Sequence, residues 1–171
     1  EHVDIIIALM VVVLDNIRSV FNVGSVFRTA DAAGVKRVYL CGITPTPVDR
    51  FGKKRRDFIK VSLGAEDYVL WEGRKSTVET IKQLKGEGYK IFAIEQAKNS
   101  VSYYKVSKKD FDFEKTALVL GNEVDGLSGA VLRRVDKILE VPMRGAMVRQ
   151  AHHPRHLGRG KESLNVAVVF G

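Results

Sequence analysis

The chain has 171 residues, the size of one ordinary domain, so we expect a single domain over residues 1–171. Hydrophobic residues make up 45% and charged residues 28%, a globular composition that excludes a disordered chain, a collagen and a disulfide-stabilised miniprotein. The 28 Lys and Arg residues outnumber the 20 Asp and Glu residues, and the net charge of +8 favours a partner that carries phosphate, such as a nucleic acid.

The apolar run at residues 5–14 carries no charge, yet it is much shorter than the roughly 20 residues of a membrane-spanning helix. The residues before it include no Lys or Arg, so we expect neither a span nor a secretory leader. Cys41 is the one cysteine of the sequence and cannot form an internal disulfide. This predicts a reducing compartment, the cytoplasm.

The first elements form a β-loop-α-β unit. Residues 11–14 are an uninterrupted β-branched run, which is typical of a strand buried on both faces. From Val23 to Ala33 apolar residues recur at helical spacing, and Gly34 stands where a helix cap is expected. Residues 38–41 are the next strand, and a right-handed crossover would make the two strands parallel.

Residues 44–60 contain two prolines and a basic run, and we expect an exposed loop there. Ser76 and Glu79 match a helix capping box, and the helix that they open runs to Gly86 and Gly88. Further strands are expected at 90–95, 116–120 and 138–141, with a short helix at 130–134. This order predicts an α/β fold in which helices sandwich a mostly parallel sheet.

Common nucleotide and metal signatures fail when they are compared residue by residue. The segment 155–162 resembles a P-loop only weakly. It has Arg155 in place of the first glycine and Glu162 in place of Ser or Thr. No dinucleotide-binding fingerprint is present, because the glycines at 86 and 88 do not open a helix after a strand. The histidines at 152, 153 and 156 have no cysteine near them, so we expect no metal site.

Three segments follow predicted strands and combine small with amide-bearing residues. They are Asn22-x-Gly24 with Arg28-Thr29, then Gly121-Asn122-Glu123-x-x-Gly126-Leu127-Ser128, and last Val141-Pro142-Met143-x-Gly145 with a later Ser163-Leu164-Asn165-Val166. Loops at the carboxyl ends of parallel strands meet in one crevice. Exposed backbone groups there suit an adenosine-like ligand.

In this order the three segments resemble the motifs of the SpoU, or TrmH-type, branch of the SPOUT RNA methyltransferases, over about residues 11–168. The resemblance implies transfer of a methyl group from S-adenosylmethionine to a ribose 2′-hydroxyl of RNA. It also implies a C-terminal trefoil knot that holds the cofactor. The active site of the family is completed by a second subunit, so we expect a homodimer.

The resemblance implies catalytic roles for Arg28, Asn22, Glu123, Ser163 and Asn165. A guanidinium stays charged and is a poor base, so we assign to Arg28 the binding of a phosphate and the stabilisation of the developing alkoxide. By helical spacing alone, Arg28 lies off the apolar face and is a solvated residue. The structural alternative for Glu123 is a surface carboxylate in a turn, and for Ser163 and Asn165 it is capping of the last helix.

The family's cofactor positions fall on Leu120, Gly121, Val141, Met143, Gly145 and Leu164. The structural alternative is that they are ordinary core residues at the ends of strands. The two roles are compatible, because a core residue at a strand end can also contact a ligand. We expect RNA contacts from Arg18, Lys53, Lys54, Arg55 and Arg56, with Phe51 and Phe58 as stacking groups near the basic run. The alternative is a solvated loop.

Two features depart from the family pattern. Residues 146–160 separate parts of the third motif that the family joins closely, and their arginines, histidines and few apolar residues predict a flexible basic insertion. The chain ends at Gly171, where the family's last helix continues and helps to close the knot and the dimer.

The leading hypothesis is an RNA 2′-O-methyltransferase, with tRNA favoured over rRNA because the sequence has no separate RNA-binding domain. The alternative is an RNA-binding protein on the same scaffold that has lost catalysis, and cofactor binding separates the two. A base-methylating SPOUT enzyme is disfavoured, because the pairs Asn22/Arg28 and Ser163/Asn165 resemble the ribose-modifying branch.

Overall fold

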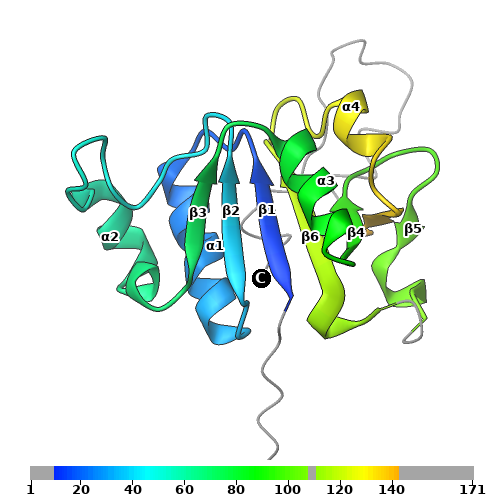
Figure 1. Ribbon diagram of the computed structural model, residues 1–171, viewed down its shortest axis with the longest axis horizontal. Coiled ribbons are helices and arrows are strands. Elements are labelled where there is room, and N and C mark those ends of the chain that lie inside the picture. Colours follow the sequence, from blue (N-terminus) through cyan, green and yellow to red (C-terminus); the bar gives the residue numbers. More distant parts are fainter. Residues whose placement is uncertain (1–9, 108–110, 143–171) are drawn as a thin grey trace, which may run out of the picture.

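The computed structural model describes residues 10–107 and 111–142 of the chain. The strands in that part are β1 (Val11–Asp15), β2 (Arg37–Cys41), β3 (Trp71–Arg74), β4 (Lys90–Ile94), β5 (Val101–Ser102), β6 (Thr116–Gly121) and β7 (Lys137–Glu140). They form one parallel sheet in the order β3-β2-β1-β6-β4-β7-β5 (Figure 1). The predicted α/β class with a mostly parallel sheet is confirmed.

Helices cover both faces of this sheet (Figure 1). The α-helices are α1 (Val20–Ala32), α2 (Arg56–Ser62), α3 (Thr77–Gly86) and α4 (Gly129–Leu132), and the 3-10 turns are η1 (Ala65–Asp67), η2 (Tyr103–Lys105) and η3 (Phe113–Lys115). Side chains of α1 and α2 pack on one face, and those of α3 and α4 on the other. None of the helices in the described ranges has the length and apolar character of a membrane span.

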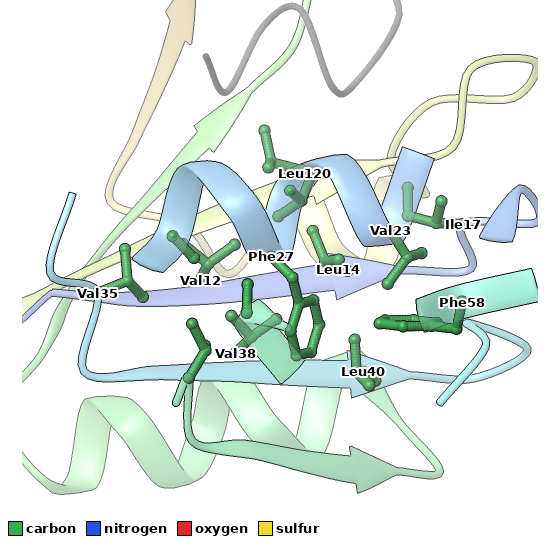
Figure 2. Close-up of a cluster of buried hydrophobic side chains, with 14 residues drawn as sticks. Val12, Leu14, Ile17, Val23, Phe27, Val35, Val38, Leu40, Phe58 and Leu120 are labelled. Carbon is green, nitrogen blue, oxygen red and sulfur yellow. The ribbon is translucent and has the colours of Figure 1, made fainter. Parts of the chain in front are cut away.

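The central strand β1 supplies both halves of the core, because successive side chains of a strand point to opposite faces. Val12 and Leu14 join the cluster under α1, which Figure 2 shows together with Phe27. Val11 and Val13 join the cluster under α3. Each fully buried side chain of this kind contributes about 1.5–3 kcal/mol. The unbroken apolar run in the sequence is therefore the consequence of burial on two sides.

The predicted strands and helices are present, with bounds that move by one to three residues. Helix α1 begins at Val20 rather than Val23, because Ser19 caps it by accepting the backbone N–H of Asn22 at 3.3 Å. Gly34 follows the helix in the left-handed conformation, with φ of 67°, as its predicted capping position requires. Strand β3 was not predicted, since its polar sequence lacks the apolar run of a central strand and it lies at the edge of the sheet.

The prediction of an exposed loop over residues 44–60 is wrong in its second half. Helix α2 begins there, and Phe58 is fully buried, with its ring edge against Phe27 at a centroid distance of 5.2 Å (Figure 2). Phe58 is therefore a core residue and not a stacking group for RNA. The charged residues around it indicate a loop, whereas Phe58 and Val61 pack against α1 and dock the helix.

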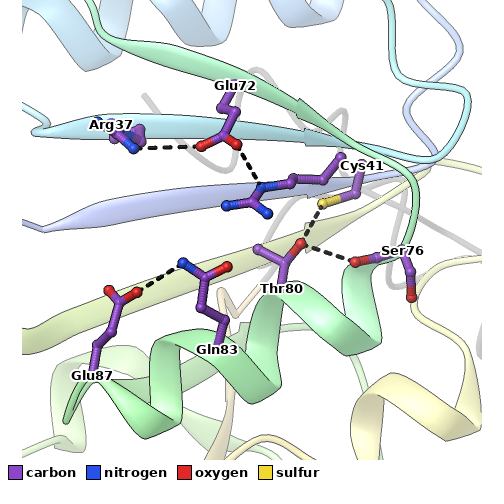
Figure 3. A network of polar contacts seen from close by, with 8 residues as sticks. Arg37, Cys41, Glu72, Ser76, Thr80, Gln83 and Glu87 are labelled. Carbon is purple, nitrogen blue, oxygen red and sulfur yellow. Dashed lines mark hydrogen bonds and ion pairs between the residues drawn. The ribbon is translucent and has the colours of Figure 1, made fainter.

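The start of α3 follows its sequence signal, since Ser76 Oγ accepts the backbone N–H of Glu79 at 3.3 Å. Thr80 of this helix donates to the Ser76 carbonyl at 2.9 Å, and its Oγ1 lies 3.6 Å from Cys41 Sγ (Figure 3). Burial raises the pKa of the Cys41 thiol. The polar contacts in Figure 3 thus connect α3 with the end of β2.

Candidate active site

The strand order reverses at the centre of the sheet, between β1 and β6. Asp15 at the end of β1 lies opposite Gly121 at the end of β6, while β2 and β3 lie on one side and β4 and β7 on the other. Such a switch point leaves a crevice outside the carboxyl ends of the strands, where open α/β sheets bind ligands. The segments that carry Asn22 and Glu123 both leave the sheet there.

The loop from β1 to α1 is tied to β2 before the helix begins. Thr44 Oγ1 accepts the backbone N–H of Ile17 at 3.1 Å and donates to the carbonyl of Cys41 at 2.7 Å. The cap of α1 then places Asn22 in the first helical turn, where it is buried. The position of Asn22 is thus determined by the sheet and the cap together.

The turn after β6 is held by its own asparagine. Asn122 Oδ1 accepts the backbone N–H groups of Val124 at 3.0 Å and Asp125 at 2.8 Å, and the Asn122 carbonyl accepts that of Gly126 at 3.0 Å. The chain doubles back so tightly that a Cβ on Gly121 would lie 2.6 Å from the carbonyl carbon of Gly126. The residues of the second motif therefore build one fixed turn.

Asn22 and Glu123 are brought together at this point. The Asn22 side-chain amide donates to Glu123 Oε1, and the two residues come from the first and second motifs. Beside them Arg18 lies 3.6 Å from Asp125 in an ion pair that is about two-thirds exposed. A surface pair of this kind contributes roughly 0–1 kcal/mol, so the buried amide and its carboxylate are the firmer connection.

Arg28 stands apart from this contact. It is exposed on α1, and by helical geometry it lies roughly 9 Å along the axis and a third of a turn from Asn22. In the described ranges no ion pair involves its guanidinium. The expected position off the apolar face is confirmed, and the catalytic role of Arg28 remains a prediction.

The residues predicted to surround a cofactor divide into two groups. Leu120 is buried in the cluster under α1, as the core interpretation expected, and Gly121 and Val141 are half-buried at the ends of β6 and β7. The other predicted site residues, Met143, Gly145, Ser163, Leu164 and Asn165, lie outside the described residues, as do the insertion at 146–160, the three neighbouring histidines and the expected knot.

The predicted basic stretch carries less free charge than its sequence indicates. Lys54 Nζ lies 2.5 and 2.6 Å from the carboxylate oxygens of Asp67, and this hydrogen bond raises the pKa of Lys54. The Arg55 guanidinium lies 2.8 Å from Asp57 and lowers the pKa of that carboxyl. Lys53 and Arg56 are exposed, and no ion pair with another described residue involves them.

Phe51 stands at the tip of a small hairpin in front of this stretch. Asp49 Oδ1 accepts the backbone N–H groups of Phe51 at 2.8 Å and Lys53 at 2.9 Å, which holds the tip in shape. The ring is 80% exposed, and the guanidinium of Arg50 lies 4.8 Å from its centroid. Of the two predicted stacking groups, Phe51 alone is accessible.

Glu95, directly after β4, also lies at this end of the sheet and was not predicted from the sequence. Its carboxylate accepts the backbone N–H of Leu127 at 2.9 Å and so contacts the turn after β6. In the sequence it is one acidic residue at the end of a predicted strand, and no local pattern distinguishes it. Across the part of the chain that the structure describes, no group of three His, Cys, Asp or Glu residues is arranged to hold a metal ion.

Comparison with known proteins identifies the family. The profile described as the SpoU rRNA Methylase family matches residues 9–148 of the chain. A tRNA (guanosine(18)-2'-O)-methyltransferase of Aquifex aeolicus is 29% identical over 163 residues, which are 95% of this chain and 65% of that protein. A 23S rRNA (guanosine(2553)-2'-O)-methyltransferase of Bacillus subtilis is 31% identical over 162 residues, 95% of this chain and 55% of that protein. The chain thus spans somewhat more than half the length of these relatives.

Solved structures agree with the sequence match. The TrmH/SpoU tRNA modifying enzyme of A. aeolicus superposes with a TM-score of 0.71 at 26% identity, covering 96% of this chain and 71% of that one. An AdoMet-bound rRNA methyltransferase of Sinorhizobium meliloti superposes with a TM-score of 0.74 at 25% identity, covering 95% and 52%. The profile match, the parallel α/β sheet and the two motifs that meet at its switch point lead to one conclusion: the chain belongs to the SpoU rRNA methylase family.

Proposed function

We propose that the protein transfers a methyl group from S-adenosylmethionine to a ribose 2′-hydroxyl of RNA. Family membership supports this reaction class, and the relatives named above are tRNA and rRNA 2′-O-methyltransferases. The structural observation that carries the proposal is the contact of Asn22 with Glu123. It joins two motifs of the family at the switch point, where an α/β sheet binds its ligand.

The residues at the ends of β6 and β7 fit the adenosine of this cofactor. Leu120 and Val141 are apolar, and Gly121 without a side chain lets the fixed turn pack directly against the end of β6. A neutral purine is held by apolar contacts and backbone groups, which this edge of the sheet supplies. When bound, the cofactor supplies an electrophilic methyl group. We assign the remaining contacts to Met143, Gly145 and Leu164.

Arg28 has the task of charge stabilisation in this proposal. The ribose 2′-oxygen gains negative charge as its proton leaves, and a guanidinium offers a fixed positive group to that oxygen and to a neighbouring phosphate. Its exposure on α1 leaves it accessible to RNA. Asn22 and Glu123 support the site through their hydrogen bond, and we assign the same function to Ser163 and Asn165.

The RNA lies, in this proposal, across the hairpin and the start of α2. Lys53 and Arg56 are exposed and suit phosphate contacts, and the exposed ring of Phe51 offers one face to an unstacked base. Arg18 offers a further positive group, beside the turn after β6, where its ion pair with Asp125 offsets part of its charge. We favour tRNA as the substrate, with rRNA as the second candidate.

We further propose that the protein is a cytoplasmic homodimer in which residues 1–171 act as one domain. Phe21 and Val124 are apolar, 63% and 64% exposed, and next in sequence to Asn22 and Glu123. A second copy placed over them would remove this apolar surface from water beside the site. Light scattering at several protein concentrations tests the assembly, and a monomer at the highest concentration would contradict it.

Mass spectrometry of nucleosides tests the reaction. The protein is incubated with total tRNA, or with rRNA, and with S-adenosylmethionine that carries a deuterated methyl group. The proposal expects labelled 2′-O-methylnucleosides, more from tRNA than from rRNA. Labelled base methylation would contradict the reaction type. RNA binding without cofactor binding in calorimetry would favour the alternative, an RNA-binding protein that has lost catalysis.

A further inference from the structure

Glu95 connects strand β7 with the turn after β6, which the sequence motifs do not connect. Its backbone N–H donates to the carbonyl of Leu139 at 2.9 Å, which places it beyond the end of β4 and beside β7. From there its side chain contacts the turn after β6. The residue therefore stands on the opposite side of that turn from α1, which carries Asn22.

Each oxygen of the Glu95 carboxylate accepts one backbone N–H. Oε2 accepts the N–H of Leu127 at 2.9 Å, and Oε1 accepts that of Gln96 at 3.1 Å. Leu127 is buried in the core under α3, so its amide has little access to water. A buried amide that loses its acceptor is costly, because nothing replaces the lost hydrogen bond.

Gly126 gives a second, steric sign of the same contact. It has a φ of 65°, and a Cβ built on it would collide with the carboxylate of Glu95. The positive φ thus favours glycine at position 126, and a side chain there would also displace the Glu95 carboxylate. The turn from Gly121 to Leu127 is held from both sides, by Asn22 through Glu123 and by Glu95 through Leu127.

We propose that Glu95 is a positioning residue for the cofactor-binding turn. The inference rests on the proposed function, because it assigns S-adenosylmethionine to this turn. Glu95 acts through Leu127 and Gly126 and does not itself touch the reacting atoms. Without Glu95 the turn keeps the Asn22 contact and the hydrogen bonds of Asn122 but loses its anchor at Leu127. It then has more conformations to lose on binding, so removal of Glu95 weakens cofactor affinity before it affects the chemical step.

The test compares Glu95→Ala and Glu95→Gln by calorimetry with S-adenosylhomocysteine and by steady-state kinetics. Glu95→Ala is expected to weaken cofactor affinity about five- to hundredfold, the range that follows from an unsatisfied buried amide. Glu95→Gln keeps one acceptor oxygen for Leu127 and should recover a large part of that loss. In both variants KM for the cofactor rises more than kcat falls. Glu87→Ala is the matched control, since Glu87 is exposed and hydrogen-bonded to Gln83 on α3.

A double-mutant cycle separates positioning from general stability. Gly126→Ala alone should weaken cofactor binding, whereas in the Glu95→Ala background its further effect should be smaller, because the collision is gone. Additive effects would overturn the proposal. A folded Glu95→Ala protein that binds the cofactor as tightly as wild type, with only its Tm lowered, would also overturn the proposal. If Glu95→Ala does not fold, the same comparison is made with Glu95→Gln.

The proposed function and this inference fail in different ways. A wild-type protein that binds no cofactor contradicts both. In that case amide hydrogen exchange at Leu127, faster in Glu95→Ala than in wild type, still tests whether Glu95 holds the Leu127 amide. Wild-type protein that binds and methylates, with Glu95 variants that do the same equally well, contradicts the inference and leaves the function standing.

Discussion

Asn22 in α1 and Glu123 in the turn after β6 are hydrogen-bonded to each other although 101 residues separate them in the sequence. Asn22 is buried and Glu123 is half-buried, so water competes little for the contact. A hydrogen bond to a charged group of this kind contributes about 1.5–3 kcal/mol. The pair sets the position of α1 relative to the turn that follows β6.

Exchange of the donor and the acceptor between positions 22 and 123 tests whether this hydrogen bond supports methyl transfer. Asn22→Asp places a second carboxylate against Glu123, and we expect kcat/KM for methyl transfer to fall about tenfold or more, because like charges repel and the donor is lost. The double variant N22D/E123Q restores a donor and an acceptor in exchanged positions, and part of the activity should return. Equal activity of Asn22→Asp and wild type would contradict a supporting role for the pair.

Arg28→Ala should lower the single-turnover rate of methyl transfer about 10²–10³-fold, because one group that stabilises the developing charge is lost. Cofactor affinity should remain unchanged, and Arg28→Lys should restore little, since an ammonium does not reproduce a two-pronged guanidinium contact. Lys36→Ala is the control, an exposed cation in the loop after α1. Turnover at the wild-type rate in Arg28→Ala would make Arg28 an ordinary surface residue.

Lys53 and Lys54 are neighbours in the sequence, and RNA binding should distinguish them. Lys53 is exposed and outside the described ion pairs, whereas Asp67 balances the charge of Lys54. Lys53→Ala should therefore weaken RNA binding and lower the slope of log K against log salt by about one, and Lys54→Ala should do so less. Filter binding at several salt concentrations measures both, and equal slopes would show that the ion pair opens on RNA.

Phe58→Ala should lower the free energy of unfolding by about 3–5 kcal/mol, because it leaves a cavity where α2 docks on α1. Phe51→Ala is the matched variant, an aromatic side chain on the same segment that is 80% exposed, and it should leave stability nearly unchanged. Urea unfolding of the three proteins gives the comparison. A small effect of Phe58→Ala would mean that α2 contributes little to the core.

Local sequence determined the central strands of the sheet and the start of α3, for reasons that need no partner. The β-branched run of β1 is buried on both faces of a parallel sheet, so it carries no polar alternation. Ser76 signals the start of α3 because a side-chain oxygen satisfies a free amide three residues later. The motif residues Asn22 and Glu123 were also predicted, by resemblance to a family with spaced motifs.

Tertiary structure alone decided which residues distant in sequence contact one another. Phe58 is core because Phe27 of another helix packs against it, and Lys54 is neutralised because Asp67 lies within reach of its ammonium. The contact of Glu95 with Leu127 likewise depends on β4 lying beside β6. Strand order and register bring such residues together. A local sequence pattern contains neither the strand order nor the register. The neighbours of a residue in sequence determine its backbone conformation, whereas residues distant in sequence determine whether its side chain is buried and whether its charge is paired.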